Sequence, residues 1–518
     1  MKNIFTKTFL PKVKSNTFDL SHDHKLSFGM GELVPTCVMD VLPGDKFEIS
    51  VENMLRFAPL VSPVMHKVDV STHYFFVPNR ILWDNWEDFI TGNDPDNVIE
   101  APVIYDLDDN GVGSINDHMG IPVDITDGDL TANALPAAAY FKIWNDYYRD
   151  QNLQEELEYK LNDGDDNDGV AIRANGPCLK RAYEHDYFTS ALPFAQKGDA
   201  VTLPLTNNEA VDVTLKSSSL NPVKGVSPTG SSISGTVSAS PDLRAGQNLI
   251  QLDPQGSLEV DINEEATDIN TLRRAFRLQE WLEKNARGGT RYIESILSHF
   301  GVKSSDARLQ RAEYIGGAKQ RMVISEVLST AETIDSSDTP VNPVGQMAGH
   351  GISVGGGKTF KYSAEEHGFI IGIINVQPQT AYQQGLNRMF SRPDRLDYFW
   401  ESFSHIGEQE ILQKELYCLN STPELNNATF GYIPRYSEYR YMDSRVSGEM
   451  RTSLNYWTMS RIFQTNPQLN AAFIEVNNQE TSDRCFAVQG EIGDTIYGHV
   501  FNNIKAIRKI PKFGIPAF

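Results

Sequence analysis

One stretch of the sequence is poorly suited to form part of a packed interior. Between Phe194 and Phe276 there is no phenylalanine, tyrosine or tryptophan over 81 residues, although aromatic residues make up 10% of the chain. Residues 217–240 add nine serines and three glycines. Such a segment buries too little apolar surface to organise a core. We therefore expect residues 203–266 to form a variable surface insertion, partly β, with a disordered segment as the alternative.

The rest of the chain alternates between short strand patterns and long excursions. Alternating apolar residues predict a strand over 68–76, and a continuous apolar run predicts a buried strand over 369–376. Helical periodicity marks an insertion over 268–300, and the glycine-rich segment 337–358 is expected to be a long loop. We find no βαβ rhythm. The pattern predicts a mainly β fold, a sandwich or jelly roll whose large loop insertions contain helices, with 1–518 as a single discontinuous domain.

Charge is distributed very unevenly along the chain. The net charge is −22, and residues 92–169 alone hold 19 acidic and 3 basic side chains, a net of −16. We interpret 92–169 as an acidic insertion with a helix over 137–161. Both ends are basic and lack acidic residues over 1–18 and 500–518. The acidic total argues against nucleic-acid binding by the whole surface, whereas the basic ends predict a separate face with its own partner.

The basic residues at the two ends are the candidates for contact with a nucleic acid. They are Lys2, Lys7, Lys12, Lys14, Lys505, Arg508, Lys509 and Lys512. A solvated tail at each end is the alternative.

A short acidic motif is the candidate for a metal site. Asp106, Asp108 and Asn110 precede a glycine, and Asp117 stands where a helix–loop–helix calcium site has a glutamate. Oxygen ligands at this spacing suit Ca²⁺, but residues 102–105 look extended rather than helical. The motif therefore predicts either a calcium loop or a solvated acidic loop, and we expect no other cofactor.

Other motifs exclude several classes of protein. Gly355–Thr359 resembles a phosphate-binding loop but lacks its first glycine and its flanking strand and helix. Neither a clustered histidine site nor a nucleophile motif occurs, so we predict no catalytic residues and no enzymatic activity. The four cysteines are far apart, which favours reduced thiols over a disulfide framework. Apolar runs are too short for membrane insertion, and we expect no secretion signal.

Twelve collinear segments together resemble one known family. The segments are Phe18–His22, Val41–Asp45, Phe75–Trp86, Ile143–Gln154, Asp186–Pro193, Ala286–Tyr292, His299–Val302, Asp306–Arg311, Glu366–Gly372, Tyr382–Arg388, His405–Gln409 and Tyr436–Tyr441. Their order resembles that of the Microviridae major capsid protein, specifically the gokushovirus branch. The resemblance fades over 92–131, 203–266 and 335–360, where composition already marks excursions.

The resemblance implies a structural function. The fold would be a viral jelly roll, an eight-stranded antiparallel sandwich, and about sixty copies would form a T=1 icosahedral shell around circular single-stranded DNA. Residues 203–266 would correspond to a protrusion around the threefold axis. A small basic packaging protein and a host cell-surface receptor would be further partners. The protein would belong to the virion and be assembled in the bacterial host cytoplasm.

A shell subunit that encloses DNA must meet two physical requirements. A shell subunit must bury surface against several neighbours, which explains a chain far longer than a bare sandwich needs. Encapsidated DNA would be repelled by acidic subunits unless the acid faces outward and the basic ends face inward. The alternative class is a carbohydrate-binding β-sandwich of a phage or surface adhesin, which requires aromatic platforms on exposed loops.

Overall fold

The computed structural model divides the chain into two compact units. The larger is built from Met1–Ala195 and Asn285–Phe518, and the smaller is Gln196–Lys284. The described residues are 14–92, 99–104, 107, 110–123, 131–199, 201, 213–215, 223–226, 232–235, 244–245, 248–249, 258–260, 269–330, 333–334, 340–342, 344–418, 422–488 and 494–513.

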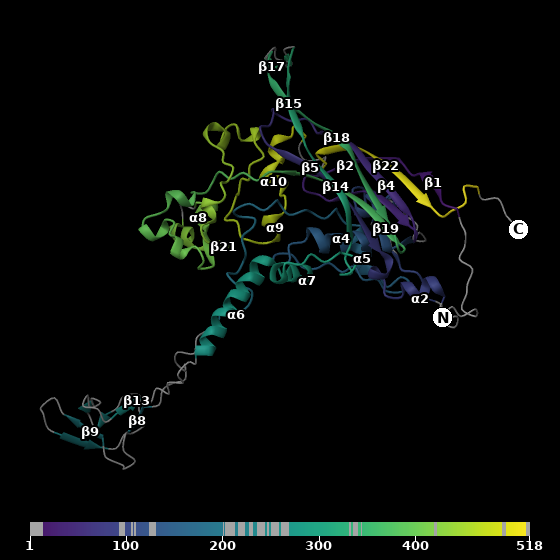
Figure 1. Ribbon diagram of the computed structural model, residues 1–518. Coiled ribbons are helices and arrows are strands. Elements are labelled where there is room, and N and C mark those ends of the chain that lie inside the picture. The colour runs from purple at the N-terminus through teal and green to yellow at the C-terminus, as the bar shows by residue number, and fades with distance from the viewer. Residues whose placement is uncertain are drawn as a thin grey trace, which may run out of the picture. The chain divides into compact units, whose positions relative to one another are not determined.

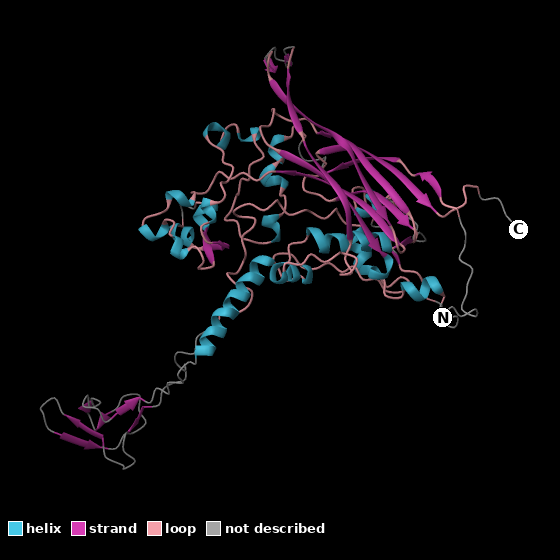
Figure 2. Cartoon of the chain, viewed as in Figure 1, coloured by secondary structure: helices cyan, strands magenta, loops and turns pink. Residues whose placement is uncertain are grey.

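Two antiparallel sheets form the centre of the larger unit (Figures 1 and 2). The six-stranded sheet has the order β1 (Asn16–Asp19), β22 (Ile496–Arg508), β4 (Lys46–Phe57), β18 (Met347–Ser363) and β15 (Val323–Leu328), with β2 (His22–Phe28) also paired to β22. The four-stranded sheet has the order β14 (Glu313–Arg321), β5 (Val68–Pro78), β19 (Gly368–Pro378) and β3 (Val34–Val41). The fold is mainly β, a jelly-roll sandwich with helical loop insertions, as the sequence predicted.

The burial of each strand shows where the core lies. Along β4, buried apolar residues alternate with outward-facing ones, so one face of the six-stranded sheet packs inward and the other stays open. Strand β19 is buried along almost its whole length, as expected of a strand covered on both faces. Between the sheets, the Tyr74 hydroxyl donates to Asn502 Oδ1 at 2.5 Å, and Asn502 Nδ2 donates to the Thr36 carbonyl at 2.9 Å. These bonds satisfy polar groups inside the sandwich.

Helices from the loop insertions cover the outer face of the four-stranded sheet, where α4 packs on β5 and β19. This layer and its surroundings contain α1 (Asn79–Leu82), α2 (Trp86–Thr91), β6 (Val103–Ile104), α3 (Ile115–Met119), β7 (Ala132–Asn133), α4 (Leu135–Ile143), the π-turn η3 (Trp144–Tyr148) and α5 (Asp168–Ala174). The helix predicted over 137–161 is wrong in its second half. The Asp150 carboxylate accepts the N–H groups of Asn152 and Leu153, which forms a turn in place of further helix.

The glycine-rich segment 337–358, predicted to be a loop, instead contains most of the long strand β18. One extra residue between Gly356 and Thr359 forms a bulge against β4. Gly356 has φ +145°, and a Cβ there would lie 2.2 Å from the Val51 carbonyl oxygen. The glycines thus permit close strand approach rather than a loop. This strand setting also differs from that of a phosphate-binding loop.

A second hydrophobic core lies in the larger unit beside the sandwich, and we call this region the second lobe. Its core comprises Tyr187, Phe188, Ala191, Tyr382, Ile411, Leu416, Phe430, Ile433, Phe463, Phe473 and Ile474. Its regular elements are short: β20 (Glu408–Leu412), β21 (Thr429–Pro434), α8 (Gln413–Leu416), α9 (Ala471–Ile474), α10 (Asn478–Thr481) and the 3₁₀ turns at Arg388–Phe390, Arg395–Asp397, Glu401–Phe403, Pro423–Asn427, Ser437–Tyr439, Gly448–Arg451 and Asn455–Trp457. The turn Asp483–Cys485 belongs to the sandwich, because Cys485 packs in the sandwich core.

The smaller unit contains short hairpin-like pairs and most of one long helix. Strand pairs form between β8 (Val213–Leu215) and β13 (Leu258–Val260), between β9 (Val223–Val226) and β10 (Ser232–Gly235), and between β11 (Arg244–Ala245) and β12 (Asn248–Leu249). Helix α6 (Ile269–Gly288) follows, and its last residues begin the second part of the larger unit, which continues with α7 (Tyr292–Ser295), η4 (Ile296–Phe300) and the pair β16 (Thr333–Ile334) and β17 (Pro340–Asn342). The predicted insertion 203–266 lies within the smaller unit, and its position around a threefold axis stays a prediction.

Candidate functional site

The two basic ends of the chain meet at one edge of the six-stranded sheet. Strand β1 pairs with the end of β22, so that Asn16 lies opposite Arg508 and Asp19 opposite Lys505. The Asn16 side chain also donates to the Ile510 carbonyl at 2.7 Å. Lys14 precedes β1, Lys505 lies in β22, and Lys509 and Lys512 follow β22. All four side chains are exposed. We call these four lysines the basic corner. Lys2, Lys7 and Lys12 lie outside the described residues.

The lysines of the basic corner have few neutralising contacts. In the strand register Lys505 lies between Asp19 and Glu48. Hydrogen bonds from the Ser21 hydroxyl and N–H lower the pKa of Asp19, and the charge of Lys505 lowers it further. The Lys509 ammonium lies next to the turn at Gly44, and a Cβ atom added to Gly44 would be 3.4 Å from Lys509 Nζ. The Lys512 ammonium lies 6.0 Å from the ring centroid of Phe513. Most of this positive charge is therefore open to an anionic partner.

Arg508 has a different environment from the lysines around it. Its Nε lies 3.0 Å from Asp45 Oδ2, and only 17% of the Arg508 side chain is exposed. Its Nη2 donates to the Asp40 carbonyl at 2.6 Å, and the guanidinium lies 5.6 Å from the Phe47 ring centroid. Asp45 is itself buried in the turn between β3 and β4 and accepts the Leu42 N–H. Arg508 thus links the end of β22 to this turn, and its charge is largely neutralised by Asp45 within the subunit.

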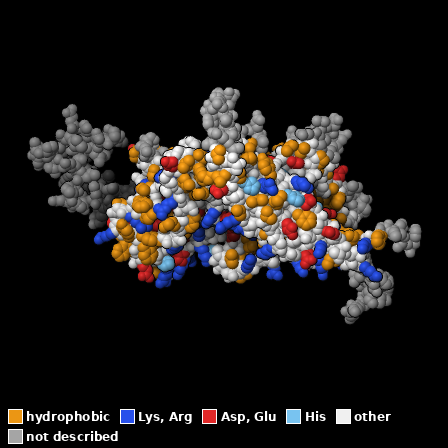
Figure 3. Space-filling model, turned by 90° about the horizontal axis from the view of Figure 1, so that it is seen from above, with side chains coloured by type: hydrophobic (Ala, Val, Ile, Leu, Met, Phe, Trp, Pro, Cys, Tyr) orange, Lys and Arg blue, Asp and Glu red, His pale blue; other side chains and the backbone are white. Residues whose placement is uncertain are grey.

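The open face of the six-stranded sheet continues the basic character of the corner. Its exposed cations are Lys25, Lys46, Arg56, Lys361 and Lys505, and its exposed acids are Asp19, Asp23, Glu48 and Glu52. This face therefore has slightly more cations than acids, although the whole chain has a net charge of −22. Figure 3, viewed from above, shows basic side chains interspersed with acidic and hydrophobic ones.

The acidic insertion lies on the opposite layer of the sandwich. Its exposed carboxylates cluster on the segment that follows η3, at Glu155, Glu156, Glu158, Asp163, Asp165, Asp166 and Asp168. This segment is held against the helical layer, where Asn145 Nδ2 donates to the Leu157 carbonyl at 2.7 Å and the Leu161 N–H donates to Leu82 at 3.0 Å. Acid and base thus lie on different layers of the larger unit.

The predicted calcium loop is only partly described, since Asp106 and Asp108 lie outside the described residues. Asn110 is buried, and its Oδ1 accepts the Ser114 hydroxyl at 2.6 Å. Asp117 lies in α3, and its Oδ2 accepts the Gly113 N–H at 2.8 Å. In the described residues no group of three or more His, Cys, Asp or Glu side chains could hold a metal ion. Calcium binding stays a prediction.

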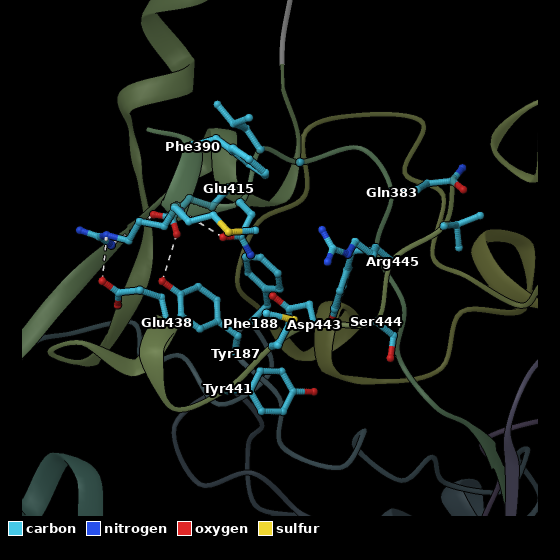
Figure 4. A pocket seen from close by; sticks show the side chains of 18 of the residues that line it. Tyr187, Phe188, Gln383, Phe390, Glu415, Glu438, Tyr441, Asp443, Ser444 and Arg445 are labelled. Atoms are coloured by element: carbon cyan, nitrogen blue, oxygen red, sulfur yellow. Dashed lines mark hydrogen bonds and ion pairs between the residues drawn. The ribbon is translucent and has the colours of Figure 1, made fainter. Parts of the chain in front are cut away.

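A pocket in the second lobe was not predicted from the sequence. It has a volume of about 250 Å³ and lies between Phe188, Phe390, Tyr441 and Asp443 (Figure 4). Burial, together with the nearby charges of Asp186 and Glu415, raises the pKa of Asp443 to about 7, and its buried Oδ1 has no hydrogen-bond partner. A local concentration of aromatic residues around Trp400 is the sequence signal that could have drawn attention to this lobe.

Comparisons with known proteins agree on one family. The family described as "Capsid protein (F protein)" matches residues 10–518. Capsid protein VP1 of Chlamydia phage 1 is 34% identical over 593 residues, covering 100% of this chain and 98% of the relative. Capsid protein VP1 of Bdellovibrio phage phiMH2K is 36% identical over 522 residues, covering 96% and 95%, and that of Spiroplasma virus 4 is 28% identical over 529 residues, covering 94% and 91%. Across the described residues, no helix is long and apolar enough to cross a bilayer.

Proposed function

This chain belongs to the phage capsid protein (F protein) family, and we propose that it is the major capsid protein of a Microviridae phage, with about sixty copies forming a T=1 icosahedral shell. The observation that carries the proposal is the match to VP1 capsid proteins over nearly the full length of both chains. In this role the protein contributes structure to the virion and no catalysis.

We propose that the shell encloses single-stranded DNA and that the basic corner faces it. The support is geometric, because the two basic ends meet on one sheet while the exposed acids of 155–168 lie on the opposite layer. An inward basic face and an outward acidic face would prevent the subunits from repelling the genome. Lysines on phosphates carry no base readout, so binding should depend little on DNA sequence.

Further partners belong to the same proposal. A small basic packaging protein would neutralise additional phosphate charge, because the chain itself is acidic overall. A receptor on the host cell surface would contact the outside of the shell, and residues 203–266 would form a protrusion there. Assembly would take place in the cytoplasm of the bacterial host.

Electron microscopy of the purified protein tests the assembly proposal. The protein is examined by negative stain over a series of salt concentrations and pH values. Closed particles of uniform size are the expected result. A chain that stays monomeric, or forms only small oligomers, under all of these conditions would contradict it.

Binding of fluorescent single-stranded DNA at several salt concentrations tests the role of the basic ends. Because Arg508 is engaged within the subunit, seven lysines remain, and full engagement would give a slope of log K against log salt of about −5. Replacing Lys505, Lys509 and Lys512 by glutamine should reduce the slope by about 2. Replacing Lys160, Lys284 and Lys303 by glutamine is the matched control, since these exposed lysines lie elsewhere. Equal slopes for both triple variants would exclude the basic corner as the DNA contact.

A further inference from the structure

The second lobe exposes a large group of apolar side chains. Phe390, Trp400 and Met442 are 66%, 51% and 67% exposed. Seen from above, hydrophobic side chains gather at the left end of the molecule, over the lobe that contains α8 and β21 in Figure 1 (Figure 3). We define the aromatic–arginine surface by these exposed residues and the guanidinium among them: Phe390, Leu396, Tyr398, Phe399, Trp400, Tyr439, Tyr441, Met442 and Arg392.

The rings of this surface contact one another and are held in place. The Phe399 ring centroid lies 4.9 Å from that of Tyr436 and 6.1 Å from that of Tyr439. The N–H of Phe399 donates to Tyr439 Oη at 3.3 Å, and that of Trp400 to Tyr436 Oη at 3.2 Å. The indole N–H of Trp400 donates to the Arg395 carbonyl at 2.9 Å. The surface is therefore preorganised, so its side chains would lose little further conformational entropy when a partner binds.

Two further features indicate that the surface is built for contact. Tyr436, at its base, has φ 65°, a left-handed conformation that is uncommon for a residue with a side chain and is concentrated at functional sites. The pocket next to it, with a volume of about 250 Å³, is lined by Phe188, Leu386, Phe390 and Met442 among others. A pocket of this size can receive an apolar side chain from a bound partner.

The size and composition of the surface match those of a protein interface. Fully buried aromatic side chains contribute about 150–250 Å² each, so eight large side chains that are about half exposed offer roughly 800 Å². A stable interface buries about 800 Å² on each partner. Aromatic residues and methionine are among the types enriched at the centre of such interfaces. The Arg392 side chain is only 9% exposed, so it supports the rings from within the subunit. Monomeric soluble proteins rarely leave an apolar patch of this size uncovered.

We propose that the aromatic–arginine surface is a contact between neighbouring copies of this chain, which rests on the proposed function as a shell subunit. The contact is heterologous, so that the surface of one copy meets a different surface of the next, and such contacts form rings where the rotation between copies closes. Trp400 and Phe390 are the anchors, and the pocket receives an apolar side chain of the neighbour.

The arrangement of arginine favours a protein partner over a sugar. A sugar stacks on the open face of an aromatic ring. Here the Arg392 guanidinium lies 4.4 Å from the ring centroid of Tyr439 and 5.5 Å from that of Tyr398, so it occupies one face of each of these rings. The remaining ring surface is apolar and suits the side chains of another subunit.

Assembly of two matched double variants tests the contact. Phe390→Ala with Trp400→Ala removes both anchors, and Val112→Ser with Ile172→Ser removes two residues of the helical layer that are 81% and 72% exposed. Circular dichroism and thermal melting establish that each variant folds. Particle yield is measured by sedimentation against protein concentration. We expect the anchor variant to need at least a tenfold higher concentration to assemble, and the control to match the wild type.

The outcomes separate this inference from the proposed function. If the folded anchor variant assembles like the wild type, the inference is wrong and the shell proposal stands. If the wild type forms only small oligomers and the anchor variant dissociates them, the shell proposal fails and the contact stands. If the wild type never self-associates, both fail. Glycan binding that is lost in the anchor variant while assembly is unchanged would assign the surface to a sugar and overturn the inference.

Discussion

The sandwich and the second lobe differ in how completely they bury their apolar side chains. In the sandwich, β19 and the neighbouring β5 are buried on both faces, by the six-stranded sheet on one side and by α4 on the other. In the second lobe, a core of short elements is surrounded by half-exposed rings such as Tyr398 and Trp400. The sandwich buries its apolar side chains within one chain, whereas the lobe leaves apolar surface for another molecule to cover.

The difference also concerns how each region is stabilised. Long strands in the sandwich satisfy their backbone groups through ladders, so its stability is a property of the single subunit. The lobe depends more on side-chain bonds, such as the one from Tyr382 Oη to Asp186 Oδ2 at 2.6 Å and the ion pair between Arg392 and Glu438 at 3.4 Å. Substitutions in the two regions should therefore separate loss of folding from loss of assembly.

The largest expected effect comes from the same substitution made in each region. Phe76→Ala in β5 removes a fully buried ring and should lower the free energy of unfolding by about 3–5 kcal/mol. Phe390→Ala in the lobe removes a ring that is 66% exposed and should change it by about 0.5 kcal/mol or less in the monomer. Urea unfolding followed by tryptophan fluorescence measures both. Equal losses would remove the distinction between the two regions.

A smaller effect is expected where the basic end of the chain joins the sandwich. Arg508→Met leaves the buried Asp45 carboxylate without its counter-charge and should lower the free energy of unfolding by about 2–3 kcal/mol. Lys505→Met, three residues earlier on the same strand and exposed, is the control and should change it by less than about 0.5 kcal/mol. The same urea titration reports both. If Lys505→Met destabilises as much, Arg508 has no special structural role.

Periodicity and composition predicted the sandwich better than the lobe, for physical reasons. The strand over 68–76 shows alternation and the strand over 369–376 a continuous apolar run, because sheet burial repeats at the period of the backbone. The strand β18 was missed because glycine is read as a loop signal, whereas here it permits close contact between strands. The basic residues were predicted from charge alone, but the approach of the two ends depends on the pairing of β1 with β22 and on the hydrogen bond between Asn16 and Ile510, which are 494 residues apart.

Side-chain partners set the limit of prediction from sequence in both regions. Nothing local in the sequence distinguishes Arg508, which is engaged with Asp45, from the free Lys509 next to it. From the sequence alone, Tyr398 and Trp400 cannot be distinguished from core residues, because exposed and buried aromatic clusters have the same composition. Only the packing shows which of them remain uncovered.

A pH effect is expected in the second lobe, at Asp443. The pKa of Asp443 is raised from 3.8 to about 7, mainly by burial, so between these values the folded state binds a proton that the unfolded state has released. Its contribution to stability is therefore complete below about pH 4 and is lost as the pH rises to about 7. Asp443→Asn should raise the melting temperature by about 2 °C at pH 8 and leave it nearly unchanged at pH 4. Glu401→Gln, at an exposed carboxylate, is the control. A pH-independent difference would contradict the assignment.

The smallest expected effect concerns calcium, at the motif within the acidic insertion. If Asp106, Asp108, Asn110 and Asp117 bind Ca²⁺, chelator should lower the melting temperature and added Ca²⁺ should restore it. The effect should be small, because Asn110 Oδ1 and Asp117 Oδ2 already accept hydrogen bonds from Ser114 and Gly113, and an ion would have to compete with these donors. At a Ca²⁺ concentration equal to the dissociation constant the gain is only about 0.4 kcal/mol. Asp108→Ala should abolish the difference between chelator and Ca²⁺, whereas Asp165→Ala, an exposed acid outside the motif, should preserve it. A wild-type melting temperature that is the same in chelator and in millimolar Ca²⁺ would favour the solvated acidic loop, and the acidic layer would then act through its summed charge alone.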